Sequence, residues 1–240
     1  MTEERMPLKQ RRDLSQIIET AFALYARNFW PLYSIAAVVI PLGIASAVLQ
    51  VAIDDDLATA IVITSLSLLQ IAVSVLAVAA IVAALGDIDA GRPAEFSHAY
   101  DVAFERFWTL LGALLRVVAI VLLLFITILG IPWAIQRSVR WLFLQQAVIL
   151  DRTSARAALS YSADAVSGSW WRTFGIMILL TVIVQIPAQI ISAPFALAPP
   201  LVSGTVSSSL SALALPLSAI GMTLLYFDLK ARRQAVAAEL

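Results

Sequence analysis

The 240-residue chain contains no cysteine and a single histidine, His98. The missing thiols exclude disulfide bonds, thiol catalysis and cysteine-ligated metal sites. One imidazole cannot build a histidine-rich metal site or an H-E-x-x-H zinc motif. The sequence also lacks a Gly-x-Ser-x-Gly elbow, a P-loop and a dinucleotide-binding fingerprint. We therefore expect no enzymatic activity, no bound metal and no cofactor.

Charged residues are scarce as well, at 13% of the chain, whereas hydrophobic residues make up 61%. A soluble domain carries about 25% charged and about 45–50% apolar residues, so both values favour a protein embedded in a bilayer. Sixteen basic and sixteen acidic residues give a formal net charge of zero. This balance excludes the basic excess of a nucleic-acid-binding protein, and membrane lipid is the expected partner.

Long apolar runs predict the membrane spans, because a helix needs about 20 mostly apolar residues to cross a bilayer. No segment alternates with the period of two that a strand requires. The predicted fold is therefore an all-α, multi-pass membrane domain over 1–240, with a polar tail at 1–12 and a second tail at 229–240. Six spans are expected, at 31–52, 57–85, 107–131, 132–150, 174–197 and 207–227. The fourth is the shortest and contains Arg137, Arg140, Gln145 and Gln146.

The placement of lysine and arginine predicts the orientation. The N-terminus, the loops at 86–106 and 151–172 and the C-terminal tail hold thirteen basic residues, whereas the loops at 53–56 and 198–206 hold none. Basic segments remain in the cytoplasm, so both termini of this cell-membrane protein are expected there.

A weak internal repeat divides the chain into units at 13–85, 95–150 and 156–228. Each unit begins with an amphipathic segment, continues through an aromatic pair and enters a hydrophobic hairpin; the pairs are Phe29-Trp30, Phe107-Trp108 and Trp170-Trp171. We interpret the amphipathic segments as helices at the cytoplasmic interface. Helices packed on the bundle are the alternative. In the first segment, Asp13 and Gln16 predict an N-terminal capping box.

Three arginines, Arg116, Arg137 and Arg140, lie inside the predicted third and fourth spans without an acidic residue before Asp151. Charges at membrane depth are costly and normally face a bundle interior or a wet cavity. Gln136, Gln145 and Gln146 add hydrogen-bonding groups nearby. Guanidinium groups pair bidentately with phosphate, so this pattern favours a ligand site for an anionic headgroup or a phosphate-bearing molecule. Alternatively, the arginines pair with backbone carbonyls, Asp151 or Asp228, or extend to the interface.

Four stretches together resemble the membrane domain of glycerophosphoryl diester phosphodiesterases, a family of bacterial six-helix membrane proteins. They are Ile131-Pro132 followed by Arg140-Trp141, Ala158-Leu159, the run from Gly168 to Gly175, and Leu225-Tyr226-Phe227-Asp228-Leu229-Lys230 within a longer closing segment. The resemblance implies the fold, a bacterial inner-membrane location and a link to glycerophospholipids. It carries over no catalytic residue, because His98 is followed by Ala99 rather than by the Arg-Gly of the hydrolase motif.

The leading functional prediction is a non-enzymatic, lipid-associated membrane protein that binds an anionic headgroup through the three arginines. The first alternative is a small permease for a phosphate-bearing solute or lipid. The second is a membrane scaffold or subunit for a separate enzyme, with a protein partner that the sequence does not identify.

Overall fold

The computed structural model describes residues 8–52, 56–126 and 130–238. Within these ranges all regular secondary structure is helical, which confirms the predicted all-α class. The helices in the first half of the chain are α1 (Leu14–Arg27), α2 (Phe29–Ala36), α3 (Val39–Ala52), α4 (Asp56–Asp89), α5 (Phe96–Glu105) and α6 (Phe107–Ile126). Those in the second half are α7 (Ile131–Arg140), α8 (Leu144–Ile149), α9 (Ala155–Val166), α10 (Trp170–Ser192), the 3₁₀ helix η2 (Ala193–Leu197) and α11 (Pro200–Ala238).

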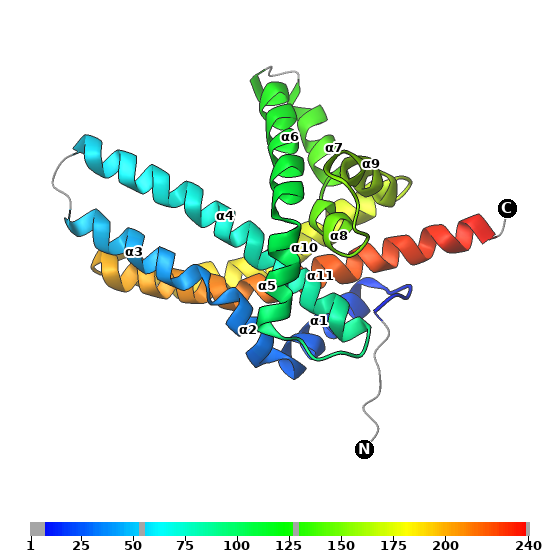
Figure 1. Ribbon diagram of the computed structural model, residues 1–240, viewed down its shortest axis with the longest axis horizontal. Coiled ribbons are helices and arrows are strands. Elements are labelled where there is room, and N and C mark those ends of the chain that lie inside the picture. The colour runs from blue at the N-terminus through cyan, green and yellow to red at the C-terminus, as the bar shows by residue number, and fades with distance from the viewer. Residues whose placement is uncertain (1–7, 53–55, 127–129, 239–240) are drawn as a thin grey trace.

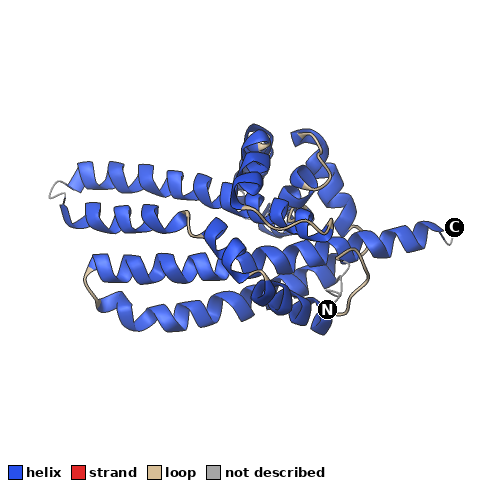
Figure 2. Ribbon diagram, turned by 60° about the horizontal axis from the view of Figure 1, so that its bottom comes forward, coloured by secondary structure: helices blue, strands red, loops and turns tan. Residues whose placement is uncertain are grey.

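Four long helices, α3, α4, α10 and the first part of α11, lie side by side as a bundle (Figures 1 and 2). Small residues allow the helices to approach closely. A Cβ added to Gly43 of α3 would lie 1.8 Å from Ser208 Oγ of α11, and one added to Gly204 would lie 2.5 Å from Ala47 Cβ. The Gly43 and Ala47 pair therefore lies at the α3–α11 contact. The rest of α11 extends beyond the bundle (Figure 1).

Five helical segments of the described chain are long and apolar enough to cross a membrane: 29–50, 60–89, 107–126, 170–197 and 200–235. They indicate a membrane-embedded, multi-pass protein. The expected single helix at 132–150 is not formed, because α7 ends at Arg140 and α8 begins only at Leu144. Arg137, Arg140 and the glutamines keep this stretch polar, and it folds as two short helices. Residues 127–129, near the end of the predicted span at 107–131, lie outside the described residues.

The α6–α7 hairpin leaves the bundle at a steep angle (Figure 1). Only 11% of the apolar window of α6 is buried inside the protein, compared with 50% for α4. Its exposed side chains include Leu115, Leu123 and Ile126. An exposed apolar surface of this size is typical of a helix that contacts membrane lipid or another protein.

The three predicted amphipathic segments form α1, α5 and α9, and each buries one face against the bundle. Ile17 and Ala21 of α1, Ala99 and Ala103 of α5 and Ala158 of α9 are almost fully buried. The predicted capping box of α1 is confirmed, with Gln16 Oε1 accepting a hydrogen bond from the Asp13 amide at 3.0 Å.

Each aromatic pair that follows these segments adopts an edge-to-face arrangement. The second ring of each pair, in Trp30, Trp108 and Trp171, is at least 75% exposed. Exposed tryptophans of this kind are typical of the membrane–water interface.

Candidate functional site

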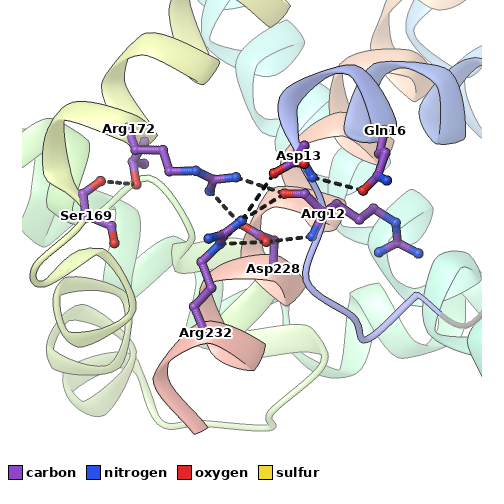
Figure 3. A network of polar contacts seen from close by, with 8 residues as sticks. Arg12, Asp13, Gln16, Ser169, Arg172, Asp228 and Arg232 are labelled. Atoms are coloured by element: carbon purple, nitrogen blue, oxygen red, sulfur yellow. Dashed lines mark hydrogen bonds and ion pairs between the residues drawn. The ribbon is translucent and has the colours of Figure 1, made fainter. Parts of the chain in front are cut away.

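A buried carboxylate lies where α1, α10 and α11 meet (Figure 3). Asp228 of α11 is 0% exposed and accepts hydrogen bonds from Arg172 Nη1, from Arg232 Nε at 2.9 Å and from the Arg12 amide at 2.8 Å. A buried carboxylate is stable only when it is paired and hydrogen-bonded, and this one is. Arg232 lies one helical turn after Asp228, whereas Arg172 comes from the first turn of α10.

The same two arginines also hold the segment before α1. Arg172 Nη2 and Arg232 Nη2 donate to the Arg12 carbonyl oxygen at 2.9 and 3.1 Å. Arg12 is 2% exposed, and burial lowers the pKa of its guanidinium, although nearby Asp228 and Asp89 oppose this change. We refer to Arg12, Arg172, Asp228 and Arg232 as the Asp228 cluster. It ties three segments that are distant in sequence into one structural unit.

Asp151, the other predicted ion-pair partner, is held by α11. Its carboxylate accepts hydrogen bonds from the Tyr226 hydroxyl and from Lys230 Nζ at 2.6 Å. The Lys230 ammonium also lies 5.4 Å from the ring centres of Tyr161 and Tyr226, a cation–π distance. Asp151 and Asp228 therefore pair with basic residues of α10 and α11, rather than with Arg116, Arg137 or Arg140.

A third group of charges lies around the end of α4. Asp87 is 4% exposed and forms an ion pair with Arg92, and its carboxylate lies 3.6 Å from Nε2 of the single histidine, His98. Asp89 pairs with Lys9 at 2.9 Å. His98 is thus a surface residue that lies beside the Asp87 carboxylate. Together with Asp228 and Asp151, they make one end of the bundle a charged layer.

The three arginines of the predicted site do not line an enclosed interior. Arg116 and Arg137 are exposed and Arg140 is half-buried, so the expected interior position is wrong for the first two. Among the described residues, no carboxylate forms an ion pair with any of the three. Arg116 Nη1 donates to the Gly112 carbonyl at 3.4 Å, and the Arg137 guanidinium lies 5.7 Å from the Trp141 ring centre. Their role in ligand binding remains a prediction.

Helix α9 is the element that α6 and α7 share as a neighbour. Ala155 Cβ at the start of α9 and Arg116 Nη1 both lie 4.0 Å from the position that a Cβ on Gly112 would occupy. The Arg140 carbonyl accepts a hydrogen bond from Ser162 Oγ of α9 at 2.8 Å. Arg152, before α9, and Arg156, within it, are exposed too. We call Arg116, Arg137, Arg140, Arg152 and Arg156 the α9 basic region.

The α9 basic region lies at the charged end of the bundle. Trp170 opens α10, and its indole Nε1 donates to the Gln136 carbonyl of α7 at 3.3 Å. A side chain on a helix points back toward the N-terminus, so Arg116 returns its guanidinium one turn, to the Gly112 carbonyl. The Arg116 guanidinium therefore lies about one helical turn closer to Trp108 than its position in the apolar run predicts.

The three predicted glutamines separate. Gln136 is exposed on α7, whereas Gln145 and Gln146 of α8 line a cavity of about 530 Å³ within the bundle. None of the residues that line this cavity is charged. The residues of the predicted site are thus divided between two regions of the structure: the arginines lie at the surface with Gln136, whereas Gln145 and Gln146 line an uncharged cavity.

Sequence reasoning did not identify the Asp228 cluster. One signal was present, because Asp228 and Arg232 have the i, i+4 spacing that brings side chains together on a helix. The contributions of Arg12 and Arg172 depend on the tertiary fold.

Comparisons with protein-family models, curated protein sequences and solved structures found no match to this chain. The resemblance to the glycerophosphoryl diester phosphodiesterase membrane domain therefore remains a prediction from the motifs.

Proposed function

We propose that this protein is a non-enzymatic integral membrane protein that binds anionic, phosphate-bearing lipid headgroups at the α9 basic region. The observation that carries the proposal is that Arg116 and Arg137 are exposed on an apolar hairpin and form no ion pair with a described carboxylate. A guanidinium group in this position needs an anion or water, and its planar donors match phosphate oxygens.

The surroundings of these arginines support an anionic ligand. Of the two nearest aspartates that follow them in sequence, Asp151 is already bonded to Tyr226 and Lys230, whereas Asp164 of α9 is exposed. The N-terminus of α9 adds the positive end of a helix dipole, with Ser154 as the N-cap. Five arginines therefore meet few free acidic groups. A basic residue near an anionic membrane surface contributes about 1 kcal/mol of attraction.

The permease alternative has less support. A transport site for phosphate would need basic groups within the bundle, whereas the described cavity is lined by uncharged residues. We therefore place the phosphate-binding groups at the lipid-facing surface instead of on a path through the protein.

A triple variant, Arg116→Gln, Arg137→Gln and Arg140→Gln, tests the proposal. The matched control is Arg11→Gln, Arg27→Gln and Arg233→Gln, which removes the same charge from exposed positions elsewhere. Both are reconstituted in nanodiscs that contain phosphatidylglycerol and phosphatidylcholine, and the lipid retained after transfer to mild detergent is quantified by mass spectrometry. We expect the site variant to retain phosphatidylglycerol about fivefold less tightly for each arginine removed, and the control to resemble the wild type.

Equal loss in the two triple variants would show that only total charge matters and would contradict a site at α9. An additional arm adds inorganic phosphate during the transfer. If a low concentration of phosphate displaces the phosphatidylglycerol, the site binds a soluble phosphate-bearing ligand. If the lipid is retained, the site binds the lipid headgroup.

A further inference from the structure

The cavity in the bundle is a second place where the protein offers unsatisfied polar groups. Its walls come from α3, α4, α8, α10 and α11, and its volume is about 530 Å³. Along α11 it extends from Ser211 to Met222, which is about 16 Å of helix. Met222 precedes Asp228 by six residues, so the cavity begins about 9 Å along α11 from the charged layer and continues away from it toward the apolar centre.

The clearest unsatisfied group is the side-chain amide of Gln146. This residue lines the cavity and is only 3% exposed, yet its Oε1 accepts no hydrogen bond from the part of the chain that the structure describes. A buried carbonyl oxygen without a donor costs about 1–3 kcal/mol. Native proteins leave few such groups, and a bound molecule or water normally supplies the missing donor.

The serines of the cavity show the same property. Ser65, Ser67, Ser208 and Ser209, elsewhere on α4 and α11, donate their hydroxyls to the carbonyl four residues earlier. Ser74 and Ser218 lie on these same two helices and line the cavity, but neither hydroxyl takes part in a hydrogen bond among the described residues. Serines in apolar helices normally bond back to the helix, so these hydroxyls are left free for a partner in the cavity.

The chemistry of the walls identifies the class of partner. Amide and hydroxyl side chains each offer both donors and acceptors, and no lining residue carries a charge to balance an ion. An ion without a counter-charge is costly to place at this depth. Apolar molecules would leave the amides unpaired. A neutral molecule that carries several hydroxyl groups satisfies both conditions.

We propose that this cavity binds a neutral polyol group, either the headgroup of an uncharged lipid or a free polyol. Gln146 supplies the buried acceptor, Ser74 supplies a hydroxyl from α4, and Ser218 supplies one from α11. Gln185 and Ser211 are exposed at its edge, so the cavity opens between α10 and α11. The site is separate from the α9 basic region and selects uncharged ligands, whereas the arginines select anionic ones.

The test uses the full chain in phosphatidylcholine nanodiscs, with monoglucosyl diacylglycerol as the lipid probe and sorbitol as the free polyol. The variant is Gln146→Leu, which removes the amide at nearly constant volume. The matched control is Gln189→Leu, one helical turn beyond Gln185 on α10 and outside the cavity lining. Retained glucolipid is quantified by mass spectrometry, and thermal unfolding is measured for each protein.

We expect the wild type and the control to retain the glucolipid and Gln146→Leu to retain it about fivefold less, which corresponds to the loss of about one hydrogen bond. The ligand-free stability of Gln146→Leu should be unchanged or higher, because the variant removes an unsatisfied group. If sorbitol raises the thermal stability of the wild type and glucolipid does not, the site is assigned to a free polyol.

Absence of a response to both probes would overturn the proposal and leave the cavity to water. A Gln146→Leu variant that matches the wild type in both glucolipid retention and stabilisation by sorbitol would overturn it as well. Loss of stability in Gln146→Leu without a change in retention would assign the amide a purely structural role.

Discussion

Replacing Asp228 with asparagine removes one negative charge from the centre of the Asp228 cluster while almost preserving the shape of the side chain. In the native protein this carboxylate, 0% exposed, faces Arg172 and Arg232, whose side chains are 29% and 35% exposed. In the variant, both guanidinium groups and the Arg12 segment would remain close together without a counter-charge. The asparagine NH₂ group can only donate hydrogen bonds, so it cannot accept the bonds that the surrounding N–H groups donate to the native carboxylate.

The expected cost follows from this burial. Removing one partner of a buried ion pair typically destabilises a protein by about 3–5 kcal/mol. Here the two arginines reach solvent and can recover part of their hydration, which places the expected loss near the lower limit, at about 3 kcal/mol. A surface pair contributes no more than about 1 kcal/mol. The Glu105–Arg106 pair is of that kind, with N···O at 3.9 Å and Glu105 63% exposed.

The assay is equilibrium unfolding by SDS in mixed micelles, followed by circular dichroism, for the wild type, Asp228→Asn and Glu105→Gln. Both variants convert one carboxylate to an amide. We expect a loss of about 3 kcal/mol for the first and less than about 1 kcal/mol for the second. If Asp228→Asn were no more destabilising than Glu105→Gln, the Asp228 cluster would not hold α1, α10 and α11 together, and this reasoning would be refuted.

Three further predictions concern other parts of the fold. Burial raises the pKa of Tyr100 to about 12 from its ordinary value of 10.0, so the native state keeps a proton that the unfolded chain loses; the resulting stability is complete below pH 10 and disappears as the pH rises toward 12. Unfolding free energies measured across this range should fall with pH in the wild type and fall less in Tyr100→Phe; parallel curves would contradict the assignment. Gly204→Ala should destabilise the protein by about 1–3 kcal/mol through overpacking against α3, whereas Gly175→Ala, with open space at its Cβ, should not; equal unfolding midpoints would show that the α3–α11 contact tolerates an extra methyl group. If the α6–α7 hairpin keeps its steep angle in the membrane, a membrane-impermeant maleimide on the side away from the charged layer should label Pro199→Cys and not Ile131→Cys; labelling of both would show that the hairpin spans the bilayer.

Much of the architecture could be predicted from the sequence because it depends on local patterns. The apolar runs located four of the long helices to within a few residues, and the Asp13 and Gln16 capping box correctly predicted the start of α1. The stretch at 132–150 was the exception. Its overall apolar composition predicted one helix and gave no sign of the break between Arg140 and Leu144.

The candidate site was less predictable, because the positions of long side chains depend on tertiary contacts. Depth along the helix axis suggested that Arg116 lies inside the membrane, yet its guanidinium folds back to Gly112 beside α9. Nor could the sequence show that Gln145 and Gln146 would face a cavity while Gln136 would not, since the intervening break between α7 and α8 reorients them.

The proposed headgroup site requires the α9 basic region to lie at headgroup depth in the bilayer. Because the chain contains no cysteine, one spin label can be placed at Ser138→Cys, next to Arg137, and another at Leu123→Cys on α6, each in an otherwise unlabelled protein. Power-saturation electron paramagnetic resonance then compares collisions with a water-soluble nickel chelate and with oxygen. We predict that the label at position 138 meets the chelate at headgroup depth and that the label at position 123 meets mainly oxygen in the apolar core. A label at 138 that is as protected from the chelate as the one at 123 would contradict the central claim that these arginines face lipid headgroups.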